Sequence, residues 1–256
     1  MRRTIRTPLP AVLLILALVT ATVAAEPAWL EGRRAGDDPR SILWEPKQAA
    51  FEKLQVALAL PPDAARASQD DYDVTFYDID IEIDESAETV DGSVAMVATS
   101  TVDGLTEVIM DLYDNMTVSG VTHDGGAALY SHALDLLTVS LNGTVNTGQT
   151  FEIVVTYSGA PIDDALDFAT HGGGNPIISS LSEPSGARQW WPCKDTPADK
   201  ADSARIALTV DDALVAVSNG MLQFVVDNGP TKTYEWFEEY PITTYLISVA
   251  VSNYAS

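Results

Sequence analysis

The feature that most restricts the fold is a period-two alternation of apolar and polar residues that starts at Tyr72. Within 72–76 the apolar side chains stand at even positions, and within 77–83 they stand at odd positions. Such alternation turns one face of a β-strand toward a core, and a change of phase marks an extra residue. The pattern predicts a long strand with a β-bulge near Phe76 and Tyr77.

Short runs rich in β-branched and aromatic residues continue this pattern along the chain. We expect further strands in 93–100, 107–112, 116–121, 134–141, 151–157, 204–210, 214–217, 221–226, 231–237 and 244–251. Dipeptides that can supply positive φ angles stand between many of them: Asp91-Gly92, Asp124-Gly125, Asn142-Gly143, Asn219-Gly220 and Asn228-Gly229. The close spacing favours an all-β fold, an antiparallel β-sandwich.

One segment, Pro161 to Asp202, shows neither strand nor helix periodicity. A stretch of about 40 residues without regular structure is long for a compact domain. It contains Trp190 and Trp191, which would be costly to leave in water. We therefore predict a long ordered loop that packs on the sandwich.

The first 25 residues have the pattern of a secretory signal peptide. Three arginines precede an apolar run at 11–19, and small residues follow at 23–25. We assign 1–25 to this signal and expect the chain to be exported, to the periplasm or the extracellular space. A retained membrane anchor is the alternative, but the run is short for a span. No later stretch approaches the ~20 apolar residues that a bilayer needs, so no membrane span is expected after cleavage.

The residues between the signal and the first strand are predicted to be a linker. Residues 26–68 mix proline, glycine and charge. A short helix fits inside this linker, with Pro46 at its first position and Phe51, Leu54 and Leu58 on one face. The globular domain is then expected over 69–256.

Charge and cysteine content exclude several classes of protein. The formal net charge of −23 would repel a phosphate backbone, so we expect no nucleic-acid partner. Cys193 stands alone and cannot form an internal disulfide, so burial of the core must stabilise the fold. Cys193 itself fits an inert buried thiol better than the alternative, a reactive one, because no histidine is near it in sequence.

A motif inside the predicted loop resembles the zinc aminopeptidases of the aminopeptidase N type, which are gluzincin metallopeptidases. The matching residues are Glu183-Pro184, Ala187-Arg188, Trp191-Pro192-Cys193, Asp195, Pro197 and Lys200-Ala201. Residues 216–220 and 240–251 are also similar to that family. The resemblance implies a saddle-like N-terminal β-sandwich that is followed, in the family, by a catalytic metallopeptidase domain.

The resemblance also implies that this chain lacks the family's zinc site. The family binds zinc through His-Glu-x-x-His and a later Glu, and neither this motif nor the family's Gly-x-Met-Glu-Asn loop occurs here. His123, His132 and His171 have no metal-ligand spacing. We therefore expect no catalytic residue, no metal site and no cofactor in this chain. Zinc is expected in a catalytic domain that the chain lacks, and the chain alone is expected to be inactive.

Glu183 is the one residue whose family role can be transferred. In related enzymes this carboxylate accepts the N-terminal ammonium of the peptide substrate, and the alternative is a solvated loop carboxylate. The family usually has Gln two positions earlier, where this chain has Leu181. The remaining motif residues are predicted to be structural: Arg188 and Asp195 as an ion pair, Trp191 as a buried anchor, Pro192 and Pro197 as backbone restraints, and Lys200 as part of the motif.

Two hypotheses of function follow. The chain is either the non-catalytic N-terminal domain of an exported zinc metallo-aminopeptidase, or a free-standing secreted β-sandwich that binds a partner through 161–202. The first implies two partners, a peptide substrate and a catalytic domain. A self-sufficient hydrolase would need a nucleophile, base or metal set that the sequence does not show.

Overall fold

The computed structural model describes residues 68–162 and 165–254. The predicted signal peptide, nearly all of the linker and the helix expected at Pro46 lie outside these residues. The described residues form fifteen strands, and their only helical elements are the short 3₁₀ turns η2 (Ser68–Asp71), η3 (Ala187–Gln189) and η4 (Thr244–Leu246). The prediction of a nearly all-β fold is confirmed.

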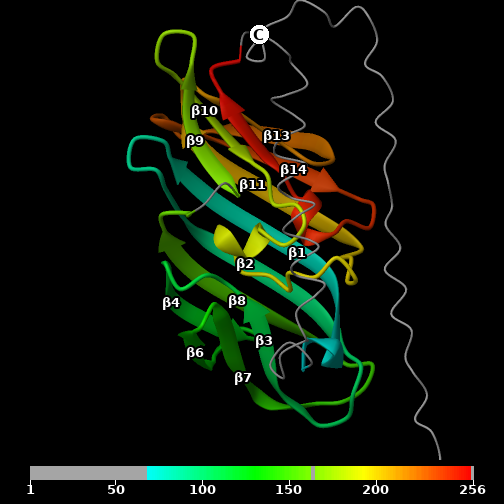
Figure 1. Cartoon of the computed structure of the whole chain (residues 1–256). Coiled ribbons are helices and arrows are strands. Elements are labelled where there is room, and N and C mark those ends of the chain that lie inside the picture. The colour runs from blue at the N-terminus through cyan, green and yellow to red at the C-terminus, as the bar shows by residue number, and fades with distance from the viewer. Residues whose placement is uncertain (1–67, 163–164, 255–256) are drawn as a thin grey trace, which may run out of the picture. The chain divides into compact units, whose positions relative to one another are not determined.

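The strands form three sheets (Figure 1). The largest has the order β13 (Met221–Asp227), β14 (Thr231–Glu238), β11 (Ser203–Asp211), β1 (Tyr72–Asp84), β2 (Thr89–Ser100), β8 (Thr150–Gly159), β4 (Met116–His123) and β5 (Gly126–Ala127). A four-stranded sheet has the order β12 (Val215–Ser218), β15 (Val249–Ser252), β10 (Asn175–Ser180) and β9 (Leu166–His171). A three-stranded sheet has the order β3 (Leu105–Asp111), β7 (Leu136–Val145) and β6 (Leu129–Ala133).

Strand β1 is the centre of the large sheet, and it departs from the antiparallel expectation on one side. It pairs antiparallel with β2 but parallel with β11, from Phe76 opposite Ser203 to Glu82 opposite Thr209. A parallel pair needs a long crossover rather than a hairpin, and most of the chain between β1 and β11 supplies it.

The predicted bulge is present in β1, at Thr75. The register with β2 shifts between Val74 and Phe76, which leaves Thr75 as the extra residue. The Thr75 carbonyl is then available to accept a hydrogen bond from Asp202 N at 2.9 Å, immediately before β11 begins. The bulge therefore connects β1 to the end of the 161–202 segment.

The prediction that 161–202 is one long loop is wrong for its first half. Strands β9 and β10 pair there as a hairpin, from Leu166 opposite Ser180 to His171 opposite Asn175. The turn uses Gly172, Gly173 and Gly174, all at positive φ, which glycine adopts without steric cost. Neither strand alternates cleanly in sequence, because β9 is mostly exposed and β10 has one fully buried side chain, Ile178.

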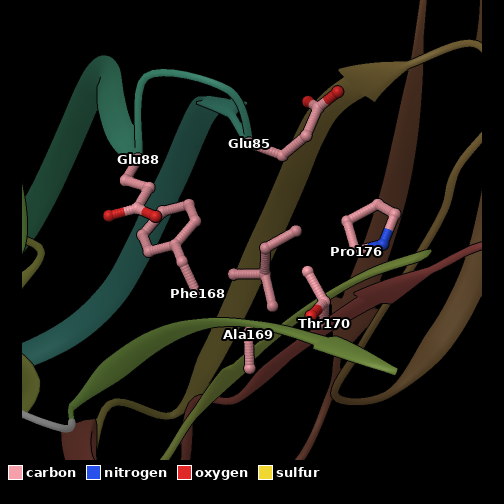
Figure 2. A pocket seen from close by; sticks show the side chains of 7 residues that line it. Glu85, Glu88, Phe168, Ala169, Thr170 and Pro176 are labelled. Atoms are coloured by element: carbon pink, nitrogen blue, oxygen red, sulfur yellow. The ribbon is translucent and has the colours of Figure 1, made fainter. Parts of the chain in front are cut away.

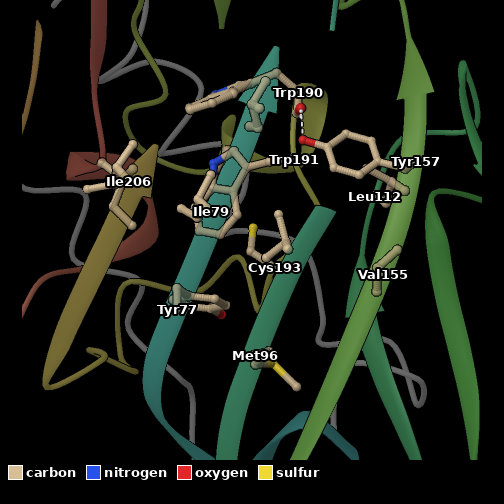
Figure 3. Packing of buried hydrophobic residues seen from close by; sticks show 14 of the residues in the cluster. Tyr77, Ile79, Met96, Leu112, Val155, Tyr157, Trp190, Trp191, Cys193 and Ile206 are labelled. Atoms are coloured by element: carbon tan, nitrogen blue, oxygen red, sulfur yellow. Dashed lines mark hydrogen bonds between the residues drawn. The ribbon is translucent and has the colours of Figure 1, made fainter. Parts of the chain in front are cut away.

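The second half of that stretch, residues 181–202, is irregular and largely buried, and we call it the motif segment. Trp190 and Trp191 are fully buried in one hydrophobic cluster that contains residues of all three sheets. Figure 3 shows them beside Tyr77 and Ile79 of β1 and Tyr157 of β8. Trp191 meets Tyr77 edge-on with ring centroids 5.0 Å apart, and Tyr157 OH donates to Trp190 O at 3.0 Å. Full burial of a large apolar side chain stabilises a fold by about 1.5–3 kcal/mol, so these aromatic residues contribute strongly to the core.

Within the part of the chain that the structure describes, no helix has the length and hydropathy of a membrane span.

Candidate functional site

The motif segment is attached to the three-stranded sheet through its backbone. Cys193 and Asp111 exchange both main-chain hydrogen bonds, at 2.7 and 3.1 Å, as an isolated antiparallel bridge beside β3. Tyr113 N donates to Arg188 O at 3.0 Å. These bonds hold the middle of the segment against a rigid element.

A buried cluster of charges anchors the same region. The Arg188 side chain lies 3.4 Å from Asp111 Oδ1 through Nη1 and 3.6 Å from Asp195 Oδ2 through Nε. The exposed fractions are 14% for Arg188, 0% for Asp111 and 1% for Asp195, so all three side chains are desolvated. The expected pairing of Arg188 with Asp195 is present, and Asp111 is an additional partner that the motif did not indicate.

Polar neighbours satisfy the two carboxylates of this cluster. Gln69 Nε2 donates to Asp111 Oδ2 at 2.8 Å, and Asp195 N donates to the same oxygen at 3.0 Å. Thr244 Oγ1 donates to Asp195 Oδ1 at 3.1 Å. Buried charges are tolerated when hydrogen bonds and an opposite charge replace water, and the two carboxylates of this cluster meet that condition.

A second ion pair, between Lys194 and Asp199, was not anticipated from the sequence. Lys194 Nζ lies 2.6 Å from Asp199 Oδ2, donates to Tyr72 O at 2.6 Å, and lies 4.6 Å from the centre of the Tyr72 ring. Both charged side chains are more than nine-tenths buried. This pair ties the end of the motif segment to the start of β1.

Glu183 stands on the surface between two buried residues, Ser182 and Pro184. Ser182 Oγ accepts a hydrogen bond from Trp190 Nε1 at 3.0 Å, and Ser182 O accepts one from Gly186 N at 2.7 Å. Leu181 N donates to Ala165 O at 3.0 Å at the base of the β9–β10 hairpin. These hydrogen bonds fix the backbone on the amino-terminal side of Glu183. Its exposed carboxylate can therefore bind a cationic group without a rearrangement of the loop.

The other motif residues divide by exposure. Trp191 and Pro192 are buried, whereas Pro197 and Lys200 are exposed. Trp191 is part of the core, which is the position its predicted structural role requires. The roles of Pro192, Pro197 and Lys200 stay predictions.

Cys193 lies in the core with no exposed surface. Burial raises the pKa of its thiol well above the ordinary value, and the nearby charges of Asp195 and Asp111 raise it further. Since the thiolate is the reactive form, this environment favours an inert thiol.

The described residues do not fit a zinc ion. No three His, Cys, Asp or Glu side chains among them come together as a possible metal site. The three histidines stand on different strands, and each has a local partner: Asn142 N for His123 Nδ1, Leu112 O for His132 Nε2, and Ser252 Oγ for His171 Nε2.

Comparison with known families identifies the fold. Residues 74–246 match the sequence model of the family described as Peptidase M1 N-terminal domain. The chain belongs to this family. The resemblance to zinc aminopeptidases that the motif suggested is thereby confirmed at the level of the M1 peptidases.

Two curated relatives carry related names. Over 84 residues the chain is 40% identical to leucine aminopeptidase 2 of Vanderwaltozyma polyspora, and this alignment covers 32% of the chain and 12% of the relative. Over 136 residues it is 29% identical to aminopeptidase N of Bos taurus, which covers 48% of the chain and 14% of the relative. The aligned part is thus a small fraction of each relative.

Solved structures share the fold. The M1 zinc metallopeptidase from Deinococcus radiodurans superposes with a TM-score of 0.64 at 23% identity, over 71% of this chain and 42% of that one. Native yeast LTA4 hydrolase superposes with a TM-score of 0.61 at 22% identity, over 77% of this chain and 32% of that one. At these identities the likeness concerns the fold alone.

Proposed function

We propose that this chain acts as the non-catalytic N-terminal domain of an exported zinc metallo-aminopeptidase. The observation that carries the proposal is the match of 74–246 to the M1 N-terminal domain, together with the aminopeptidase names of the two curated relatives described above. Less than half of the D. radiodurans peptidase corresponds to this chain, which leaves room in such enzymes for a separate catalytic domain.

In this proposal Glu183 recognises the free amine of the peptide. An enzyme that removes one residue from an amino end must hold a positive charge at a fixed distance from the reacting bond. A carboxylate on a rigid backbone does this by a charge-assisted hydrogen bond, and its strength rises when the cleft closes over it and excludes water. The contacts of Ser182 with Trp190 and Gly186 support this role, because they fix the residue before Glu183.

Zinc would belong to the catalytic domain, where it supplies an activated water and polarises the scissile carbonyl. The residues of this chain would do the positioning: Glu183 binds the amine, and the Arg188 cluster keeps its loop in place. Leu181 stands where relatives place a glutamine, and its side chain offers the substrate an apolar contact in place of a polar one.

Export is part of the proposal and depends on residues 1–25. A charged start, an apolar run and small residues at 23–25 support a signal that is removed after translocation. Amino-terminal sequencing of the secreted chain tests it, and the expected new terminus is Glu26.

The proposal is tested by pairing the chain with a catalytic domain. The nucleotide sequence after Ser256 is read for an open frame that encodes His-Glu-x-x-His, and the chain is purified with and without that product. We expect turnover of an aminoacyl anilide only when both are present. One tightly held zinc per chain, or turnover by the chain alone that survives careful purification, would contradict the proposal.

A further inference from the structure

A pocket lies between the β1–β2 turn and the β9–β10 hairpin. The chain continues from this hairpin into the motif segment. Its volume is about 200 Å³. The residues that line it are Glu85, Glu88, Phe168, Ala169, Thr170, Pro176 and Ile178. Figure 2 shows Glu85 and Glu88 on the turn, and Phe168, Ala169, Thr170 and Pro176 on the hairpin.

The walls of this pocket combine two kinds of chemistry. Phe168 is half-buried, Ile178 is buried, and with Pro176 they make an apolar floor. Glu85 and Glu88 contribute two carboxylates at the rim, and neither has an ion pair or hydrogen bond to another described side chain. Glu88 and Phe168 line the same pocket (Figure 2).

Both walls are held in place by their own backbone. Asp84 Oδ1 accepts hydrogen bonds from Ser86 N and Ala87 N, each at 2.9 Å, which orders the turn between the two glutamates. Asp84 pairs with Thr89 at the end of the β1–β2 ladder, and Phe168 pairs directly with Ile178 across the hairpin. The pocket is therefore formed before a ligand arrives.

These features select the chemical class of the ligand. Two carboxylates repel anions, and a neutral apolar group would desolvate them without compensation. The described residues offer no third His, Cys, Asp or Glu here to complete a metal site. A cation on an apolar stem is complementary to these walls. Its charge can pair with the carboxylates, its stem can pack on the apolar floor, and an aromatic face attracts a cation.

We propose that this pocket binds the side chain of an arginine or lysine in a peptide. The guanidinium or ammonium group lies between Glu85 and Glu88, and the methylene stem packs on Phe168 and Ile178. The proposal does not rest on the peptidase function, because it concerns only the chain's own affinity for a basic side chain.

The test is a titration of the chain with N-acetyl-arginine N-methylamide, followed by the amide NMR signals. We expect saturable shifts at residues 85–88 and 168–178. The citrulline analogue has nearly the same shape without the charge and should bind at least about tenfold more weakly. Phe168→Leu should weaken binding of the arginine probe by about two- to fivefold, because it keeps the apolar bulk and removes the aromatic face.

The matched control separates this pocket from general attraction to an acidic chain. The pair Glu85→Gln with Glu88→Gln should weaken binding at least about tenfold. The pair Glu107→Gln with Glu239→Gln removes the same charge from exposed positions outside the pocket and should change binding less than about twofold. The proposal would be overturned if the citrulline analogue bound as tightly as the arginine probe, or if the two pairs of substitutions weakened binding equally. It would also be overturned if the NMR shifts mapped to residues outside the pocket. All variants are first checked for an unchanged unfolding transition.

Discussion

Asp111 and Arg188 are 77 residues apart in sequence, yet Arg188 Nη1 lies 3.4 Å from Asp111 Oδ1 in the interior of the domain. This contact joins the end of β3 to the motif segment, and Asp195 completes the cluster from the other side of the guanidinium. Two carboxylates thus share one arginine. Removal of the arginine would therefore take a counter-charge away from two buried carboxylates.

Replacing Arg188 should destabilise the fold more than replacing either carboxylate. Arg188→Met takes the guanidinium away from two buried carboxylates and should lower the free energy of unfolding by about 3–5 kcal/mol. Asp195→Asn leaves one carboxylate with the arginine and loses mainly hydrogen bonding, so the expected loss is about 1–3 kcal/mol. Urea unfolding at neutral pH measures both.

The control for these variants is Asp167→Asn, an exposed carboxylate of β9, which should stay within about 0.5 kcal/mol of the parent chain. If Asp195→Asn lowers the free energy of unfolding as much as Arg188→Met does, then something other than the balance of charge in the cluster stabilises the segment.

Ser182 should matter for stability although it is a small side chain. Ser182→Ala removes the acceptor of the buried Trp190 Nε1, and an unsatisfied buried donor costs about 1–3 kcal/mol. Ser179→Ala, at an exposed position of β10, is the matched control and should be nearly neutral. Thermal or urea unfolding compares the two. Equal effects would mean that the bond to Trp190 does not hold the residue before Glu183.

Alkaline pH should destabilise the chain, beginning with Cys193. The unfolded chain releases the thiol proton near its ordinary pKa of 9.0, whereas the folded chain keeps it because burial raises the pKa of Cys193. The folded state then binds more protons, so the free energy of unfolding falls with rising pH, by up to about 1.4 kcal/mol per pH unit.

Three tyrosines extend this loss to higher pH. Burial also raises the pKa values of Tyr72, Tyr77 and Tyr157 well above the ordinary value of 10.0, so the decline should steepen beyond that pH. Cys193→Ala should reduce the slope between pH 9 and pH 10, where the tyrosines of the unfolded chain also begin to titrate, and keep the later slope. A variant with the parent slope in that interval would show that another group titrates there.

Much of the fold could be predicted because local patterns encode it. Alternation in β1 predicted a long strand and its bulge, and Asp124-Gly125 and Asn228-Gly229 predicted the turns of two hairpins. The turns expected at Asp91-Gly92 and Asn142-Gly143 are wrong, because these residues lie inside β2 and β7. The parallel pairing of β1 with β11 could not be predicted, because period-two alternation is the same in both orientations. The β9–β10 hairpin was missed since its solvent exposure removes the apolar alternation.

The candidate site shows a similar division. The motif located Glu183, Arg188 and Asp195, but it gave no indication of Asp111, whose contact depends on the tertiary fold. The sequence signal for Asp111 was its position directly after the apolar residues of β3. A carboxylate in a buried strand needs a partner. Lys194 and Asp199 are five residues apart in an irregular segment, and no periodic rule connects them.

Whether Glu183 recognises a peptide's amino terminus is measured with Glu183→Gln in the chain completed with its catalytic domain. The variant keeps the shape and removes the charge, so a charge-assisted contact worth about 1.5–3 kcal/mol is lost. We expect kcat/KM for free-amine peptides to fall about 10- to 150-fold while the unfolding temperature stays almost unchanged, with Asp167→Asn as the control. Full kcat/KM in the Glu183→Gln enzyme would contradict the claim, since it would make this carboxylate an ordinary surface residue.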